Sequence, residues 1–120
     1  MTYDNNNIFA KILRKEIPCK KVYENEHALA FYDINPQTKI HILVIPKGKY
    51  ISFADFSKNA LKDEIEGFFK VVGKVAEDQN LVEEGYRILA NHGINAGQEV
   101  PHFHVHIFGK QPLGPMISKT

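Results

Sequence analysis

The stretch that decides the fold class lies near the C-terminus and reads Pro101-His102-Phe103-His104-Val105-His106-Ile107-Phe108-Gly109. Histidine alternates with apolar residues here, and a period of two is the pattern of a β-strand. We therefore expect a strand over 102–108 in which His102, His104 and His106 share one face, about 6.5–7 Å apart successively. The apolar residues between them are expected to pack on the core from the opposite face.

A row of three imidazoles packs poorly in a hydrophobic core and is unusual on a protein surface. It therefore indicates a functional site. One hypothesis is a metal site, because histidines at i and i+2 on a strand can share a zinc ion. Three such positions span roughly 13 Å, however, and one ion does not easily meet all of them. A metal site would therefore need further ligands, for which Asp33, His41 and Glu99 are the candidates.

The second hypothesis is nucleophilic catalysis at phosphorus. An imidazole can attack a phosphoryl centre, and water then hydrolyses the covalent intermediate. The middle histidine, His104, would be the nucleophile, and its neighbours would hydrogen-bond the phosphate oxygens where charge accumulates. The loop 91–98 favours this hypothesis, because its glycines Gly93 and Gly97 allow backbone N–H groups to turn inward and bind an anion.

The rest of the chain predicts one long helix and several short strands. We expect a first helix over 8–15, capped by Asn6 or Asn7 and ended by Pro18. A long helix is expected over 57–80, capped by Ser57 or Asn59, with a buried stripe formed by Leu61, Ile65, Phe68, Val72 and Val75. The remaining strands are expected over 22–24, 28–32, 40–45 and 86–90. This order of elements predicts an α+β fold with a five-stranded antiparallel sheet and two helices.

Composition restricts the class of protein. The chain has 120 residues, a formal net charge of +1, 43% hydrophobic and 24% charged residues, which predicts a single globular domain over 1–120. The near-neutral charge argues against a nucleic-acid-binding protein. Cys19 has no partner for an intrachain disulfide, and the polar N-terminus does not resemble a signal peptide. The longest apolar run, 28–32, falls far short of the ~20 residues that cross a bilayer. We therefore expect a cytoplasmic protein without a membrane partner.

The histidine stretch resembles the signature of the histidine triad (HIT) superfamily. Four further segments resemble its Hint branch, the histidine triad nucleotide-binding proteins: 8–18, 30–37, 41–46 and 97–100. Residues 112–116 are similar to the C-terminus of bacterial members, within a tail of about 110–120. The resemblance implies a HIT-like fold and a homodimer whose two sheets join into one ten-stranded sheet. It also implies hydrolysis of purine nucleoside 5′-phosphoramidates and aminoacyl-adenylates through a covalent nucleotidyl-histidine, without a metal or other cofactor.

The resemblance also implies residue roles. His104 matches the nucleophile, His102 and His106 match its flanking residues, and His41 matches a fourth histidine behind the triad. Asp33, with Ile34 beside it, matches the carboxylate that binds the ribose of an AMP or GMP derivative. The apolar walls around the base match Phe9, Ile12, Ile17, Phe31 and Leu43. The loop on the phosphate side matches Asn91, Gly97, Gln98 and Glu99. His27 and His92 match no site position, and we expect both at the surface.

The chain also departs from the family pattern. Animal members usually have Ser where this chain has Glu99, and a carboxylate near a phosphate repels it unless it serves the leaving group. We therefore expect Glu99 to hydrogen-bond the departing amine. Pro101 stands where Tyr is frequent, Lys110 stands where Gly is common, and the chain has no Trp. A dinucleoside polyphosphate hydrolase and a nucleotide-binding regulatory protein with little turnover stay open as alternatives.

Overall fold

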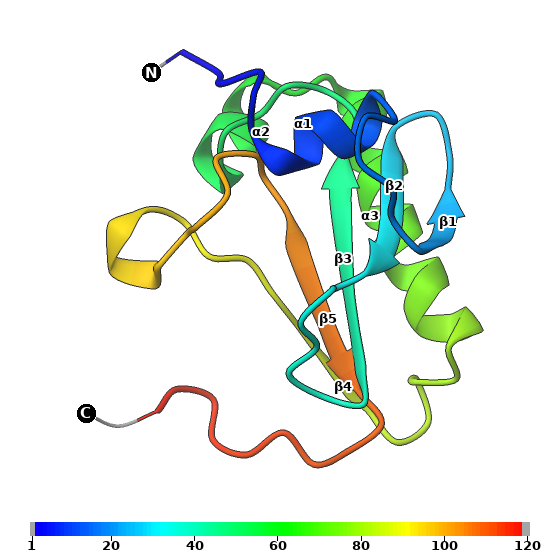
Figure 1. Cartoon of the computed structure of the whole chain (residues 1–120). Coiled ribbons are helices and arrows are strands. Elements are labelled where there is room, and N and C mark those ends of the chain that lie inside the picture. The colour runs from blue at the N-terminus through cyan, green and yellow to red at the C-terminus, as the bar shows by residue number, and fades with distance from the viewer. Residues whose placement is uncertain (1, 119–120) are drawn as a thin grey trace.

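The computed structural model describes residues 2–118, so residue 1 and residues 119–120 of the expected domain lie outside the described part. Its centre is the predicted antiparallel sheet of five strands in the order β1-β2-β3-β5-β4 (Figure 1). The strands are β1 (Lys21–Glu24), β2 (Ala28–Tyr32), β3 (Ile40–Pro46), β4 (Tyr86–Leu89) and β5 (Val105–Gly109). The α+β class is thereby confirmed.

Helix α3 (Lys62–Asp78) covers one face of the sheet. Its Phe68 and Val75 pack on alternate strand residues, namely Ala28, Ala30, Ile42, Val44, Val105 and Ile107. All of these side chains are buried, and each large one stabilises the fold by about 1.5–3 kcal/mol relative to exposure. Period-two alternation therefore sends one set of strand residues to this core and leaves the other set for the opposite face.

Helix α1 (Ile8–Leu13) lies on that opposite face (Figure 1). Its Phe9 and Ile12 pack against a second apolar cluster that contains Leu29, Phe31, Leu43 and Ile45. The Asn7 side chain accepts a hydrogen bond from Ala10 N at 2.9 Å, so the predicted cap is confirmed. The helix ends at Leu13, well before Pro18, because the chain turns into the left-handed region at Lys15 (φ 64°). The expectation that Pro18 ends this helix was wrong.

The expected long helix is two helices, so residues 2–118 contain three α-helices and not two. Helix α2 (Phe53–Asn59) precedes α3, and the backbone is extended at Ala60 and Leu61 between them. Ser52 Oγ caps α2 by accepting from Asp55 N, and the Glu64 carboxylate accepts from Leu61 N at 3.0 Å at the start of α3. These two caps start separate helices, so Ser57 and Asn59 lie inside α2 and cap nothing. Leu61 is 70% exposed, which removes it from the expected buried stripe.

The strand β5 is shorter than expected, since it begins at Val105 and not at His102. Its pairing with β3 starts at Val44↔Val105, and β3 ends at Pro46. The backbone N–H of Phe103 donates instead to the Tyr50 carbonyl oxygen at 2.7 Å, and residues 102–104 are not part of the ladder. The alternation of faces continues nonetheless: Phe103 joins the cluster under α3, while His102 and His104 contact Phe9 of α1.

The sheet has β1 at one edge and β4 at the other, and β4 carries partly exposed apolar side chains at Tyr86 and Ile88. The loop that contains residues 94–96 and the C-terminal tail project on the same side of the molecule (Figure 1). The tail is held by Arg87, whose guanidinium donates to the carbonyl oxygens of Gly114 and Pro115.

The ten-stranded sheet of a homodimer stays a prediction. Within residues 2–118, no helix has the length and apolar character needed to span a bilayer.

Candidate active site

His102 is fully buried, and its two ring nitrogens have different partners. Nε2 lies 2.8 Å from the carbonyl oxygen of Pro46. A carbonyl oxygen only accepts, so this nitrogen carries a proton. Burial lowers the pKa of His102 to about 4, so the ring is neutral at pH 7 and Nδ1 is unprotonated. Nδ1 lies 2.6 Å from the hydroxyl of Tyr3, which therefore donates to it.

The ring of His104 carries its proton on the other nitrogen, Nδ1, and not on Nε2 as in His102. Its Nδ1 lies 2.7 Å from the backbone carbonyl oxygen of His102, so Nδ1 carries the proton and donates. Burial lowers the pKa of His104, against the raising effects of the His102 hydrogen bond and of the charges of Asp33 and Glu99. The ring is therefore neutral at pH 7, and its lone pair is on Nε2. The geometry prepares Nε2 of His104 to act as a nucleophile.

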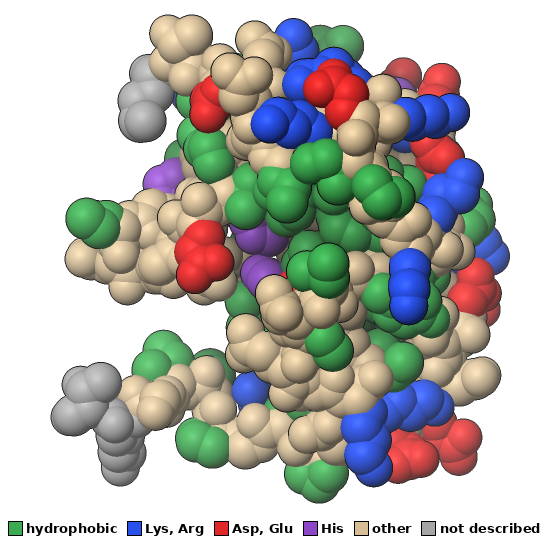
Figure 2. Space-filling view, viewed as in Figure 1, with side chains coloured by type: hydrophobic (Ala, Val, Ile, Leu, Met, Phe, Trp, Pro, Cys, Tyr) green, Lys and Arg blue, Asp and Glu red, His purple; other side chains and the backbone are tan. Residues whose placement is uncertain are grey.

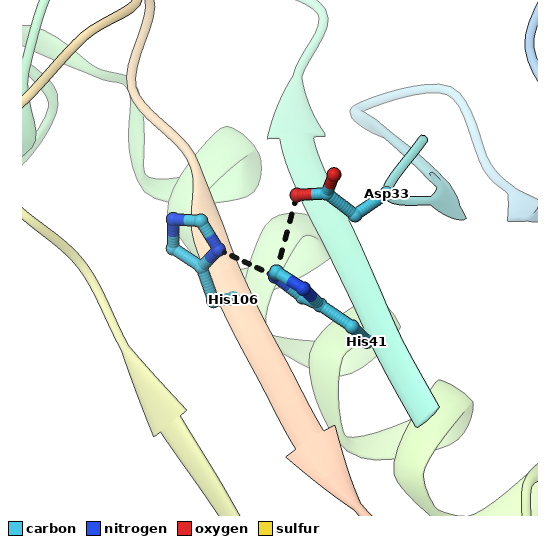
Figure 3. Close-up of side chains that lie close together, drawn as sticks. All are labelled: Asp33, His41 and His106. Atoms are coloured by element: carbon cyan, nitrogen blue, oxygen red, sulfur yellow. Dashed lines mark hydrogen bonds and ion pairs between the residues drawn. The ribbon is translucent and has the colours of Figure 1, made fainter. Parts of the chain in front are cut away.

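His41 and Asp33 fix the third histidine (Figure 3). The backbone N–H of Gln37 donates to His41 Nδ1 at 3.1 Å, so the proton of neutral His41 is on Nε2. That Nε2 lies 2.9 Å from His106 Nδ1 and 3.4 Å from an Asp33 carboxylate oxygen. Burial lowers the pKa of His41, although the Asp33 charge opposes this effect.

His106 consequently accepts at Nδ1 and carries its own proton on Nε2. Figure 3 shows this second nitrogen turned away from His41. Burial, together with the neighbouring His104 and His41, lowers the pKa of His106 to about 4 against the raising effect of the Asp33 charge, so the ring is neutral at pH 7. The rings of His104 and His106 lie 5.1 Å apart between centroids. A ring with an unprotonated Nε2 and a ring with an Nε2–H donor are therefore neighbours on one face of the sheet.

Asp33, His41 and His106 are also potential metal ligands. Within residues 2–118, their ligand atoms all lie within 4.8 Å of one another, and imidazole and carboxylate suit zinc. An ion there would have to replace the hydrogen bond between His41 and His106. Glu99, which the metal hypothesis also considered, is not a member of this group.

The expected walls of the base pocket gather beside the histidines. Phe9, Ile12, Phe31 and Leu43 form one buried cluster against which Ile17 packs. The ring of Phe9 stands edge-on to that of His104, with 5.0 Å between centroids. Hydrophobic side chains also gather at the surface next to the histidines (Figure 2). An open groove of about 670 Å³ continues past this cluster, lined by Ile12, Ile17, Leu29 and the lysines Lys15, Lys21 and Lys47, among others.

Ile34 lies apart from this cluster. Its side chain is 90% exposed, beside Asp33 in the loop after β2. The Asp33 carboxylate accepts from Asn35 N at 2.8 Å through one oxygen and approaches His41 through the other. The structure therefore places Asp33 next to the histidines and leaves Ile34 on the surface.

The loop 91–98 is held by its own hydrogen bonds. Gly93 (φ 74°) and Gly97 (φ 72°) both use the left-handed region, as expected of glycine. Their geometry directs Gly97 N to the Ile94 carbonyl and Gln98 N to the Gly93 carbonyl, each at 3.1 Å. These two N–H groups are therefore engaged within the loop, and the expectation that the loop turns them toward an anion was wrong for them.

Gln98 holds the same loop with its side chain. Its Oε1 accepts from Gly93 N at 3.1 Å, and its Nε2 donates to the carbonyls of Ile51 and Val100 at 2.8 and 3.0 Å. Asn91 is half-buried at the start of the loop, and Glu99 is exposed at its end. The Glu99 charge raises the pKa of His104, so Glu99 lies close enough to influence that ring.

Three contacts of the site had no signal in the sequence. Tyr3 lies in a polar N-terminal segment without periodicity, Gln37 acts through its backbone N–H, and Pro46 acts through its carbonyl oxygen. Of the two histidines expected at the surface, His92 is exposed. The other, His27, is half-buried because Gly67 leaves space for its ring; a Cβ there would lie 2.4 Å from it.

Comparison with known proteins supports one family over almost the whole chain. The family model for the HIT domain matches residues 14–113. A HIT-like protein of Azospirillum brasilense is 62% identical over 118 residues, which are 98% of this chain and 97% of that protein. The purine nucleoside phosphoramidase of Escherichia coli strain K12 is 40% identical over 111 residues, or 92% of each chain. The structure of a histidine triad protein from Clostridium difficile aligns with a TM-score of 0.86 at 37% identity, covering 97% of this chain and 100% of that one. With His102, His104 and His106 on one face of its sheet, the chain belongs to the HIT domain family.

Proposed function

We propose that the protein is a HIT-family hydrolase that cleaves the P–N bond of purine nucleoside 5′-phosphoramidates and also acts on aminoacyl-adenylates. One observation carries the proposal: the ring of His104, with an unprotonated Nε2, neighbours the ring of His106, with a protonated Nε2, and each ring is held by its own partner. This pairing supplies a nucleophile and a donor for a phosphate oxygen. The 40% identity to a purine nucleoside phosphoramidase supports the choice of substrate.

The first step forms a covalent intermediate. His104 Nε2 attacks the α-phosphorus, the P–N bond breaks, and the protonated nitrogen of the substrate leaves as a neutral amine. His104 then carries a positive charge, which its Nδ1–H shares with the His102 carbonyl at 2.7 Å. His106 donates its Nε2–H to a nonbridging oxygen, and Glu99 accepts a hydrogen bond from the departing amine.

The second step releases the nucleotide. Water attacks the phosphorus, the Nε2–P bond breaks, and its electron pair returns to His104 while the water proton goes to solvent. The product is a nucleoside monophosphate. Its base would lie against Phe9, Ile12, Ile17, Phe31 and Leu43, and its ribose hydroxyls would bind Asp33. We also propose that the protein acts as a homodimer, with Asn91, Gly97 and Gln98 shaping the loop on the phosphate side.

Turnover of adenosine 5′-phosphoramidate by the wild type and by His104→Ala tests this function. We expect turnover by the wild type, a nucleotidyl adduct in samples quenched with denaturant at alkaline pH, where the histidine N–P bond survives, and neither in His104→Ala, which should still bind AMP. His92→Ala is the control, because His92 is exposed and outside the site. Turnover by His104→Ala at the wild-type rate would contradict the mechanism, and a wild type that binds AMP without turnover would favour a regulatory protein.

The two enzymatic alternatives need separate measurements. Comparing the phosphoramidate with diadenosine polyphosphates distinguishes a dinucleoside polyphosphate hydrolase from a phosphoramidase. The grouping of Asp33, His41 and His106 favours a metal-dependent hydrolase as a second candidate. Metal analysis of the purified protein and turnover in the presence of a chelator decide between them: stoichiometric zinc that is lost together with activity would support the metal.

A further inference from the structure

The N-terminal segment contacts the histidine row through Tyr3. Its hydroxyl lies 2.6 Å from Nδ1 of His102, a residue 99 positions away along the chain. We propose that Tyr3 is a positioning residue, which fixes the tautomer and orientation of His102 and, through the His102 backbone, the nucleophile His104. This inference rests on the proposed hydrolase function and extends it to a residue outside the histidine triad.

The buried His102 ring needs a donor at Nδ1. Its Nε2–H is used by the Pro46 carbonyl, so the other nitrogen is an acceptor that burial has removed from water. A buried acceptor without a donor is costly, and Tyr3 supplies the donor. Burial raises the pKa of the Tyr3 hydroxyl, which therefore stays protonated at neutral pH and can only act as the donor here. If the ring turned over, the Tyr3 bond and the Pro46 bond would both be lost.

Packing adds to this constraint and transmits it to His104. The rings of Tyr3 and Phe9 stand edge-on to the His102 ring, with centroids at 5.6 and 6.2 Å. The backbone of His102 then acts at both ends: its N–H donates to the Val100 carbonyl at 2.8 Å, and its carbonyl accepts from His104 Nδ1 at 2.7 Å. The position of the His102 residue therefore sets the acceptor that orients the nucleophile.

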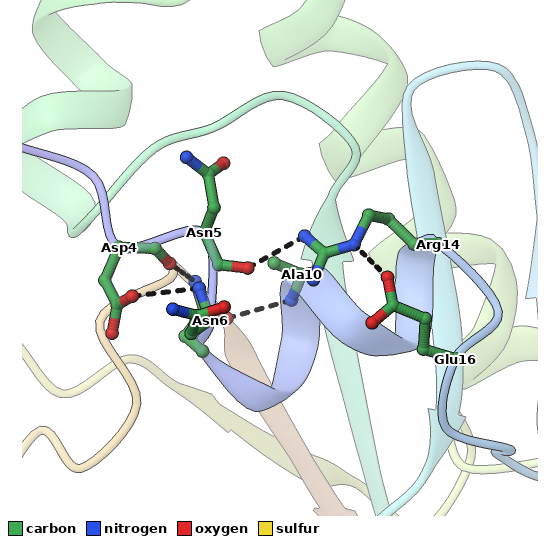
Figure 4. Close-up of polar contacts among 7 residues, drawn as sticks. Asp4, Asn5, Asn6, Ala10, Arg14 and Glu16 are labelled. Atoms are coloured by element: carbon green, nitrogen blue, oxygen red, sulfur yellow. Dashed lines mark hydrogen bonds and ion pairs between the residues drawn. The ribbon is translucent and has the colours of Figure 1, made fainter.

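The segment that contains Tyr3 is held in place by hydrogen bonds. Figure 4 shows the segment after Tyr3 folded onto α1 by polar contacts. The Arg14 guanidinium donates to the Asn5 carbonyl at 2.8 Å, and the Asn7 side chain donates to the Asp4 carbonyl at 2.8 Å. The same α1 carries Phe9, which contacts both His102 and His104. One short structural unit thus presents two rings to the buried histidine.

The variant Tyr3→Phe tests the proposal, because it keeps the ring and removes only the hydroxyl. We expect kcat to fall about three- to tenfold, the range for one lost hydrogen bond, with KM changed less than about twofold. We also expect the ¹H–¹⁵N spectrum of the histidine rings to change at His102, whose Nδ1 loses its donor. Tyr50→Phe is the matched control, since it removes a hydroxyl that donates to Glu64 at 2.6 Å on the helical side of the fold. It should leave kcat and the His102 signals unchanged.

The outcomes separate this proposal from the function on which it rests. A Tyr3→Phe protein with wild-type kcat and wild-type His102 signals overturns the proposal, even if its melting temperature falls. If the wild type does not hydrolyse the phosphoramidate, the proposed function fails by itself. The spectrum then decides the role of Tyr3 alone: a changed His102 tautomer signal supports it, and an unchanged signal overturns it.

Discussion

His41 donates its Nε2–H to Nδ1 of His106 across 2.9 Å, and the Gln37 N–H at 3.1 Å on the far side of the His41 ring fixes the direction of that bond. A hydrogen bond given at Nδ1 forces the proton of neutral His106 onto Nε2. The N–H donor that His106 would offer to a phosphate in the proposed mechanism is therefore set by His41, which need not touch the substrate.

Replacing His41 should lower the rate without removing the nucleophile. His41→Phe keeps a ring against Phe108, whose centroid lies 4.3 Å away, but gives His106 no donor. We expect kcat to fall about tenfold or more, because a half-buried acceptor loses its partner and His106 loses its fixed tautomer. Steady-state kinetics and ring ¹⁵N shifts of His106 measure this effect. The exposed His92→Ala is the control, and an unchanged kcat in His41→Phe would show that His41 only fills space.

Stability should fall on mild acidification. Burial lowers the pKa of both His102 and His106 to about 4, whereas an unfolded histidine titrates near 6.5. Below pH ~6.5 the unfolded chain binds protons that the folded chain refuses, so this contribution to stability is complete above that pH and is lost toward pH ~4. Each histidine contributes a slope of about 1.4 kcal/mol per pH unit in that window.

Urea unfolding between pH 4.5 and pH 8, a range of about 3.5 units around the ordinary histidine pKa, measures this slope. His102→Leu should reduce the slope of the free energy of unfolding against pH by the contribution of one histidine. His92→Ala should leave this slope as in the wild type. A free energy of unfolding that stays constant from pH 8 down to pH 5 would contradict the assignment of neutral, buried rings.

Glu99 should act on the leaving amine and on the nucleophile. Glu99→Gln removes a charge that raises the pKa of His104, so the acid limb of the kcat/KM profile should move to lower pH. If the carboxylate also accepts from the departing amine, kcat for the phosphoramidate should fall about tenfold. The control is Glu83→Gln, in an exposed turn before β4. Full phosphoramidase kcat in Glu99→Gln would exclude the leaving-group role.

Sequence patterns predicted the faces of the sheet well and the ends of its elements poorly. The alternation from Phe103 to Ile107 assigned the histidines and the core residues to the correct faces. It did not show that the pairing with β3 ends at Val105, because that depends on a distant segment: the Phe103 N–H donates to the Tyr50 carbonyl oxygen. Hydrophobic periodicity likewise ran through the break between α2 and α3, where local hydrogen bonds of Ser52 and Glu64 determine the helix starts.

The parts of the site formed by residues close in sequence could be predicted. The contacts between residues far apart in sequence could not. His104 precedes β5 and His106 lies within it, and the extended chain keeps both on one face, so their proximity follows from spacing alone. The Tyr3–His102 bond joins opposite ends of the chain, and the Pro46 acceptor is a backbone atom that any residue would supply. In the loop 91–98, composition predicted the backbone conformation of the glycines but not the hydrogen bonds. Gly93 and Gly97 adopt the expected positive φ, while the N–H groups of Gly97 and Gln98 donate to carbonyl oxygens within the loop.

The exposed edge at β4 gives a test of the homodimer. Ile88 is 47% exposed on this strand, and an unpaired edge with apolar side chains pairs readily with a second copy. We expect sedimentation of the wild type as a dimer and of Ile88→Lys as a monomer, because a charge would be buried without a partner in the joined sheet. Lys70→Ala, on the exposed side of α3, is a control that should leave the dimer intact. A wild type that sediments as a monomer at every concentration would exclude the ten-stranded sheet. The hydrogen bonds that fix the tautomers of His104 and His106 lie within one chain, so the Ile88→Lys monomer should retain the His104 adduct even if its turnover falls.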